Sequence, residues 1–131
     1  MIYDFSIHSG YQMEFIDITN KIRDQIKKSG IREGLCTVFV PHTTCGVTIN
    51  QNANPDIKTD FIKTLEHLVP NEELYKAFEV SSPPNIKAAL MGFDQTLIIR
   101  EGELVLGNWQ GIFLTEFDGP QIRNIMVKIL S

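Results

Sequence analysis

The sequence predicts an α+β fold, namely a largely antiparallel β-sandwich with two to three helices in a single domain, residues 1–131. Three observations support this prediction. Strand-type alternation dominates both ends of the chain, helix-type periodicity falls between them, and 131 residues is an ordinary length for one domain. The composition, with 43% hydrophobic and 21% charged residues, is that of a soluble globular protein.

The first third of the chain predicts two strands and a helix. Residues 1–9 and 11–18 read as strands, and the dipeptide Ser9-Gly10 between them is typical of a hairpin turn. Isoleucine then recurs every four residues over 18–26, which predicts a helix with one buried stripe. Gly30 suits the left-handed position that ends such a helix.

The middle of the chain predicts a central strand and two further helices. Residues 35–40 are apolar on both faces, as in a strand covered on both sides. Asn54 and Pro55 are typical of the start of a helix, which Pro70 ends. A second, short helix is expected over residues 86–91.

The last third predicts strands again. They are expected at residues 95–100, 104–106, 109–117 and 121–130, as a meander. Strands therefore lead, helices follow and strands finish, which is the order typical of an α+β protein.

Charge and hydropathy exclude two classes of partner. A net charge of −4 with scattered lysine and arginine gives no basic surface for nucleic acid. No apolar run is long enough to span a bilayer, and the N-terminus lacks a signal peptide, so we expect a cytoplasmic protein. Cys36 and Cys45 are expected to be reduced, buried hydrophobes; a nucleophilic Cys45 is the alternative.

Residues 41–56, PHTTCGVTINQNANPD, predict a strand with one unusually polar face. The even positions are His42, Thr44, Gly46, Thr48, Asn50 and Asn52. No charged residue occurs from Pro41 to Asn54. Short uncharged donors and acceptors suit a site that orients a ligand, whereas a plain solvent face is the alternative.

A second polar segment, residues 107–124, carries the acidic candidate. Glu116 follows apolar residues on an expected core strand, so it is either a structural partner of Arg123 or an acid, base or metal ligand. Asp118 is the other carboxylate that could pair with Arg123. Trp109 is expected to pack in the core or an interface, or to stack on a flat ligand.

The motifs PHTTCGVTINQNANPD and LVLGNWQGIFLTEFDGP resemble those of the secondary thiamine-phosphate synthase family over nearly the whole chain. The resemblance implies a homotrimer that joins a pyrimidine diphosphate to a thiazole phosphate with loss of pyrophosphate. No tightly bound cofactor is implied, although Mg²⁺ fits the departure of pyrophosphate.

The same resemblance implies roles for individual residues. His42 and Glu116 are the expected catalytic residues, and Asp56 and Asp118 the expected Mg²⁺ ligands. The expected substrate-binding residues are Thr43, Thr44, Thr48, Asn50, Gln51, Asn52, Trp109, Gln110 and Arg123.

Three positions depart from the family pattern. Gln51 and Asn54 stand where carboxylates are common, and Asn85 stands where a histidine is common. Amides hold cations more weakly than carboxylates or imidazole. The rival hypothesis is therefore a non-catalytic trimeric protein that binds a small phosphorylated or heterocyclic metabolite.

Overall fold

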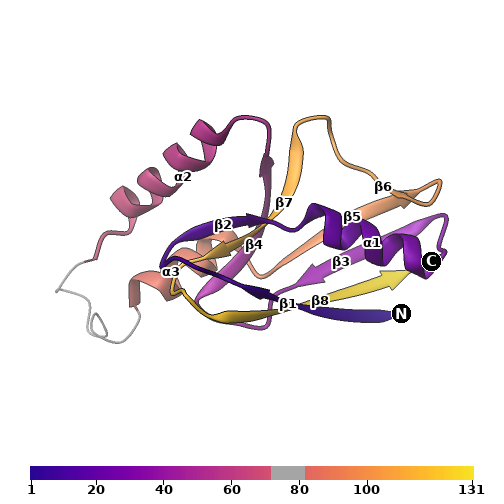
Figure 1. Cartoon of the computed structure of the whole chain (residues 1–131), viewed down its shortest axis with the longest axis horizontal. Coiled ribbons are helices and arrows are strands. Elements are labelled where there is room, and N and C mark those ends of the chain that lie inside the picture. Colours follow the sequence, from indigo (N-terminus) through magenta and orange to yellow (C-terminus); the bar gives the residue numbers. More distant parts are fainter. Residues whose placement is uncertain (72–81) are drawn as a thin grey trace.

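The computed structural model describes residues 1–71 and 82–131, which form two antiparallel sheets and three helices (Figure 1). In spatial order the larger sheet contains β1 (Ile2–His8), β8 (Ile122–Leu130), β3 (Gly34–Phe39), β5 (Asp94–Arg100) and β6 (Glu103–Leu104). The smaller sheet contains β2 (Glu14–Asp17), β7 (Gln110–Glu116) and β4 (Cys45–Gln51). The helices are α1 (Thr19–Ser29), α2 (Pro55–Leu68) and α3 (Ser82–Met91). The predicted α+β sandwich is confirmed.

Two expected strand pairings are wrong. The strands on either side of Ser9-Gly10 do not form a hairpin, because β1 pairs with β8 while β2 pairs with β7 in the other sheet. The C-terminal meander is also broken, since β7 leaves the sheet that holds β5, β6 and β8. Local sequence identified the strands, but the partners are distant in the chain.

The helix ends follow local capping chemistry. At the start of α1 the N-cap position is Ile18, which has no side-chain cap; one residue earlier, the Asp17 carboxylate accepts hydrogen bonds from the backbone N–H of Thr19 at 2.9 Å and from its hydroxyl. Gly30 ends the helix with a φ of 70°. At α2 the Asn54 side chain accepts from the N–H of Asp56 at 2.9 Å, as its position before Pro55 predicts.

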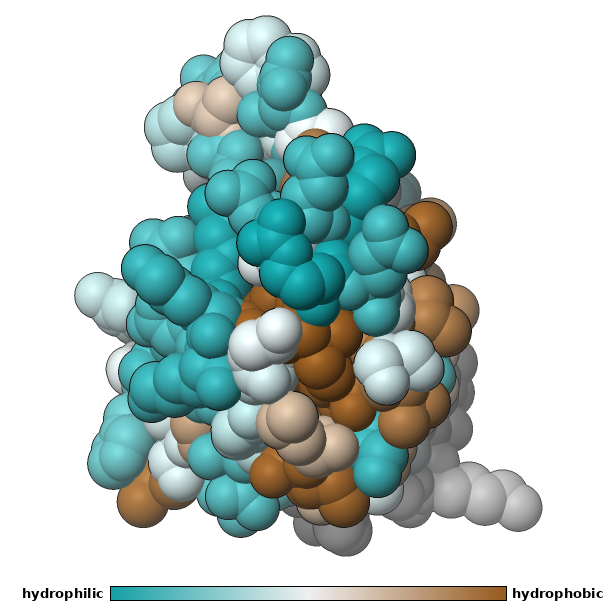
Figure 2. Space-filling view, turned by 90° about the vertical axis from the view of Figure 1, so that its right-hand side faces the viewer, coloured by the Kyte–Doolittle hydropathy of each residue, from teal (hydrophilic) through white to brown (hydrophobic). Residues whose placement is uncertain are grey.

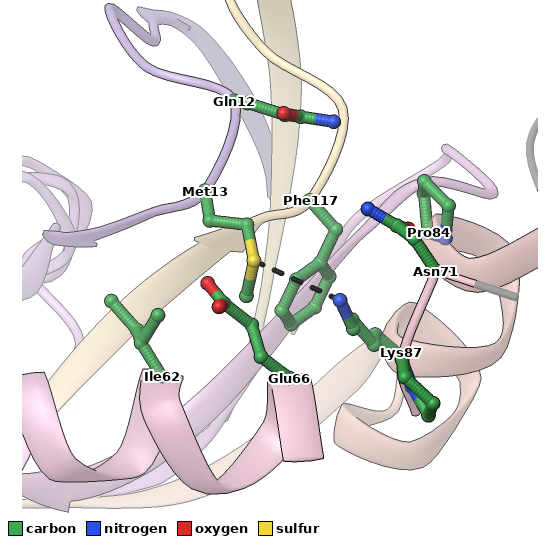
Figure 3. Close-up of a pocket in the computed structure, with 9 residues that line it drawn as sticks. Gln12, Met13, Ile62, Glu66, Asn71, Pro84, Lys87 and Phe117 are labelled. Atoms are coloured by element: carbon green, nitrogen blue, oxygen red, sulfur yellow. Dashed lines mark hydrogen bonds between the residues drawn. The ribbon is translucent and has the colours of Figure 1, made fainter. Parts of the chain in front are cut away.

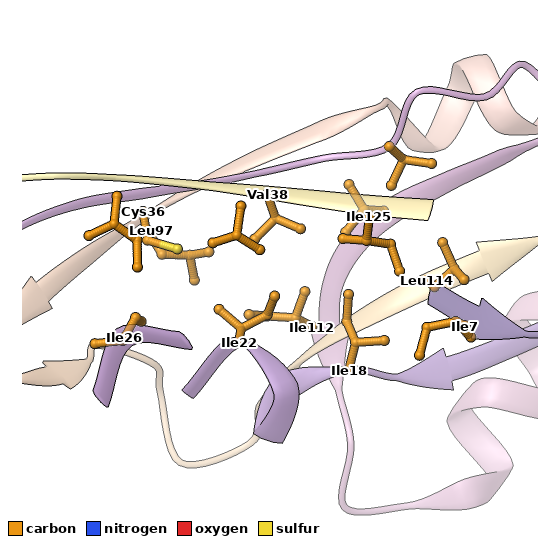
Figure 4. Packing of buried hydrophobic residues seen from close by; sticks show 14 of the residues in the cluster. Ile7, Ile18, Ile22, Ile26, Cys36, Val38, Leu97, Ile112, Leu114 and Ile125 are labelled. Atoms are coloured by element: carbon orange, nitrogen blue, oxygen red, sulfur yellow. The ribbon is translucent and has the colours of Figure 1, made fainter. Parts of the chain in front are cut away.

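The main core lies between the sheets and under α1 (Figure 4). The isoleucine stripe of α1 is confirmed, because Ile18, Ile22 and Ile26 are each at most 1% exposed. From β4 the odd-numbered residues Cys45 and Val47 enter this core, as their parity predicts. Each such side chain contributes about 1.5–3 kcal/mol by leaving water.

A second cluster lies on the other face of the smaller sheet, under α2 and α3. It consists of Phe15, Leu65, Ala88, Phe113 and Phe117. At Gly46 the C-terminal end of α3 approaches β4 so closely that an added Cβ would lie 3.1 Å from the carbonyl oxygen of Ala88 and 2.5 Å from that of Gly92, the residue after the helix. This contact fixes α3 on the sheet.

Figure 2 views the molecule from the end at which both termini lie. Hydrophobic residues gather in the middle of this view, with hydrophilic residues around and above them. A cavity of about 390 Å³ lies between α1 and β6, and Ile26 and Leu104 are among the residues that line it. None of the helices in the described part of the chain is long and apolar enough to cross a membrane.

Candidate functional site

A buried ion pair between Glu116 and Arg123 joins the two sheets at one end of the sandwich. Glu116 is the last residue of β7 and is 0% exposed; Arg123 lies on β8 and is 3% exposed. Arg123 donates from Nε to Glu116 Oε1 at 2.8 Å and from Nη2 to Oε2 at 2.5 Å. One of the two interpretations of Glu116, a structural partner of Arg123, is thus confirmed.

The Glu116 carboxylate has a full set of donors. Besides Arg123, it accepts from the Ser9 hydroxyl at 2.7 Å and from the backbone N–H groups of Phe117 and Asp118 at 3.1 and 3.2 Å. Burial raises the pKa of Glu116, but these hydrogen bonds and the guanidinium charge outweigh burial and hold it below its usual value. The carboxylate is therefore ionised and held in place.

His42 and Thr44 lie at the same end as this ion pair but are not aligned along a strand. The strand begins only at Cys45, so the expected continuous polar face does not include them. Thr44 accepts a hydrogen bond from Arg123 Nη2 at 2.7 Å, and His42 Nε2 accepts from the backbone N–H of Asn124 at 3.0 Å. Burial and the nearby guanidinium lower the pKa of His42, which favours the neutral ring that this contact requires.

The amide-bearing residues lie at the opposite end of β4. Asn52 donates from its backbone to the carbonyl of Trp109 at 2.9 Å, and the Gln110 side chain accepts from the N–H of Gly107 at 2.8 Å. Asn50 accepts from the backbone of Gln51 at 2.7 Å. These contacts shape the local backbone, and a small hollow of about 180 Å³ lies beside them.

The structure therefore divides the predicted site residues into two groups. One group surrounds Arg123, and the other surrounds Asn52, with about 20 Å of strand between them. Between the groups Thr48 is half-buried opposite Phe113. Thr43 is exposed, and Trp109 is 64% exposed, so it is not part of the core. Their roles toward a ligand stay predictions.

The two expected Mg²⁺ ligands do not meet. Asp56 lies in the first turn of α2, near the Asn52 end of β4, whereas Asp118 follows the far end of β7. In the part of the chain that the structure describes, no group of three His, Cys, Asp or Glu side chains could hold a metal ion. Asp56 and Asp118 therefore do not fit a single Mg²⁺ ion.

A cavity that the sequence did not indicate lies between α2, α3 and the loop before β2 (Figure 3). We call it the Lys87 cavity; its volume is about 480 Å³. The apolar side chains that line it are Met13, Ile62, Pro70, Pro84 and Phe117. The polar ones are Gln12, Glu66, Asn71 and Lys87.

Lys87 is the unusual member of this cavity, because its side chain is only 5% exposed. Nζ reaches from α3 to the thioether sulfur of Met13 at 3.8 Å (Figure 3). Among the described residues no carboxylate oxygen lies within 4.0 Å of it. Burial lowers the pKa of Lys87, and the Glu66 carboxylate offsets only part of this effect.

One sequence signal could have found Lys87. It follows Pro83 by four residues and precedes Met91 by four, so it occupies the helix stripe that carries the buried side chains of α3. A lysine in an apolar stripe is unusual, since lysine is almost never fully buried without a partner.

The two cysteines are confirmed as buried, free thiols. Burial raises the pKa of Cys36 to about 11 and that of Cys45 to about 12. A thiol with such a pKa is hardly ionised at neutral pH, which argues against the nucleophilic alternative for Cys45.

Comparison with known proteins places the chain in a family. The model of the UPF0047 protein YjbQ-like family matches residues 3–131. The chain belongs to this family. Among UPF0047 relatives, a protein of Methanocaldococcus jannaschii is 43% identical over 100% of this chain and 95% of its own length. YugU of Bacillus subtilis is 37% identical over the full length of both chains.

Two solved structures have the same fold as this chain. An uncharacterized conserved protein of the family from Clostridium acetobutylicum is 45% identical, with a TM-score of 0.95 over 98% of this chain and 99% of that chain. A protein of unknown function from Sulfolobus solfataricus is 30% identical, also with a TM-score of 0.95, over 100% of this chain and 96% of that one.

These findings correct the expected identity. The resemblance to the secondary thiamine-phosphate synthase family is wrong as an identification, because the matching family and the relatives are named as UPF0047 proteins. Nothing in the names of these relatives or of the solved structures links them to thiamine-phosphate synthesis. The transferase activity that rested on the resemblance is withdrawn with it.

Proposed function

We propose that the protein binds a small organic molecule in the Lys87 cavity, through an oxygen atom that accepts hydrogen bonds from Lys87. The single observation that carries this proposal is the buried Lys87 ammonium group, whose one recorded contact among the described residues is a thioether. The cavity volume of about 480 Å³ is in the range of small-molecule sites.

The energetics favour an oxygen ligand. Sulfur in a thioether is a weak acceptor, so among the described residues the ammonium group gains no strong hydrogen bond for the water that it gives up. A carboxylate or carbonyl oxygen in the cavity would restore that bond, and charge-assisted hydrogen bonds contribute about 1.5–3 kcal/mol.

The rest of the lining defines the body of the ligand. Phe117, Ile62 and Met13 offer an apolar surface, which suits a short branched hydrocarbon chain. The side-chain amides of Gln12 and Asn71 can bind additional polar groups. The proposed ligand class is thus a compact carboxylate or carbonyl compound with an apolar chain.

Titration with 3-methylbutanoate tests the proposal. We expect a saturable shift of the Met13 methyl resonance in protein labelled with ¹³C-methyl methionine, because Met13 contacts Lys87 in the cavity. In Lys87→Met the affinity should fall by about tenfold or more, which is the loss of one charge-assisted hydrogen bond.

Lys63→Met is the matched control, since Lys63 is exposed on α2 and lines none of this cavity. It should bind the probe as the wild type does. Equal affinity of the Lys87→Met variant and the wild type, or a Met13 resonance that does not move, would contradict the proposal.

We further propose that the protein assembles as a homotrimer through the outer face of the larger sheet. Six large hydrophobic residues on this sheet are between 44% and 61% exposed: Ile2, Leu35, Phe39, Ile98, Ile122 and Leu130. Leu35 lies opposite both Ile98 and Leu130 in neighbouring strands, so part of this surface is continuous. Exposed apolar patches of this kind are typical of protein interfaces.

Sedimentation velocity tests the assembly. The molecular mass of the wild type from sedimentation should be three times the chain mass of 14.9 kDa. Ile98→Lys places a charge in the middle of the patch and should shift the protein toward the monomer, whereas Asn20→Lys on the exposed side of α1 should not. A wild-type monomer would refute the trimer without affecting the ligand proposal.

A further inference from the structure

We propose that Lys87 is an amine nucleophile that forms an imine with the carbonyl carbon of small apolar aldehydes and ketones. The inference rests on the proposed function, because it uses the same cavity and the same side chain. It adds a covalent reaction to the proposed binding of a small organic molecule in this cavity.

The position of Lys87 suits this reaction. It lies on α3, which is fixed to β4 by the close contact at Gly46 and by the hydrogen bond from the N–H of Val47 to the carbonyl of Gly92 at 3.0 Å. The side chain is thus presented by a rigid element rather than by a loop. Lys87 lines the cavity, and among the described residues its contact there is the Met13 sulfur, which is a weak acceptor.

The electrostatic setting points the same way. Only a neutral amine can attack a carbonyl group, and burial lowers the pKa of Lys87 and so increases the neutral fraction. Glu66 is the one other charged side chain among the described residues that line the cavity, and it lies more than 4.0 Å from Nζ. No close ion pair with a described residue therefore holds the amine in its protonated form.

The reaction balances without an oxidant or reductant. The nitrogen lone pair attacks the carbonyl carbon, a proton passes from nitrogen to oxygen, and a carbinolamine forms. The carbinolamine hydroxyl group gains a proton and leaves as water while the nitrogen loses its remaining proton, so the carbon–nitrogen bond becomes a double bond. Glu66, from α2, also lines the cavity and is the carboxylate that would exchange these protons.

Trapping with sodium cyanoborohydride tests the inference. The full-length protein is incubated with 3-methylbutanal and the reductant, then digested and examined by mass spectrometry. Hydride addition to the imine carbon leaves a stable secondary amine. We expect the 3-methylbutyl group to be attached to Lys87 at a rate at least tenfold higher than to Lys63, which is exposed on the neighbouring helix.

Two further arms make the result specific. Lys87→Arg keeps the positive charge but cannot form an imine, so the fast labelling at this position should disappear. An excess of 3-methylbutanoate should slow labelling of Lys87 in the wild type and leave that of Lys63 unchanged.

The outcomes separate this inference from the proposed function. Labelling of Lys87 no faster than Lys63, with carboxylate binding intact, overturns the imine and leaves the binding site standing. If the protein neither binds the carboxylate nor shows fast labelling of Lys87, both the imine inference and the proposed binding function are overturned. Fast labelling that the carboxylate does not slow would contradict a shared cavity.

Discussion

Replacing Arg123 by methionine is expected to lower the free energy of unfolding by about 3–5 kcal/mol. The variant leaves the Glu116 carboxylate, which is 0% exposed, without its cationic partner. It also removes the donor to Thr44, so the hydrogen bonds that Arg123 makes from β8 to β7 and to the segment before β4 are lost. Urea unfolding at neutral pH measures the effect.

Two comparisons identify the cause. Arg23→Met removes an exposed arginine of α1 and should change the stability by less than about 0.5 kcal/mol. Adding Glu116→Gln to Arg123→Met should recover part of the loss, because a neutral amide no longer leaves a buried charge. A loss in Arg123→Met no larger than that in Arg23→Met would show that the pair does not brace the sheets.

The pH dependence follows from the lowered pKa of Glu116. In the wild type the stabilisation is complete above the unfolded pKa of about 4.3 and is lost as the pH falls through the lower folded pKa. In Arg123→Met burial remains while the guanidinium is gone, so the pKa of Glu116 rises. The difference in unfolding free energy between the variant and the wild type should therefore narrow as the pH falls below about 4.3.

Gly46→Ala is expected to destabilise the protein by about 2–3 kcal/mol and to abolish binding of 3-methylbutanoate. The added Cβ would lie 2.5 Å from the carbonyl oxygen of Gly92 and 3.1 Å from that of Ala88. Both are backbone atoms, so α3 must move away from β4 and carry Lys87 with it. Urea unfolding and the Met13 titration measure the two effects.

Gly10→Ala is the matched control for this change. The nearest atom to its added Cβ is 4.0 Å away, at the flexible end of Glu14, so stability should change by less than about 0.5 kcal/mol. Unaltered stability and binding in Gly46→Ala would mean that α3 is not held against β4 as tightly as the distances indicate.

Local chemistry in the sequence determined most of the elements. Residues close to one another in the chain were sufficient to predict three features. These are the isoleucine stripe of α1, the Asn54 cap of α2 and the alternation by which odd-numbered residues of β4 face the core. The pairing of Glu116 with Arg123 was predicted as one of two alternatives, because Glu116 was expected on a core strand, where Arg123 could stabilise its charge.

Only the tertiary structure decided which strands pair and where the cavity lies. The partners of β1 and β2 come from the far end of the chain, and no local pattern specifies a contact over such a separation. His42 lies outside the expected strand face because β4 begins only at Cys45, and its ring accepts a hydrogen bond from a backbone N–H of β8. Lys87 could be identified as a candidate ligand-binding residue only from the structure, in which α2, α3 and the loop before β2 enclose it. The reason is that burial is a property of the packed molecule.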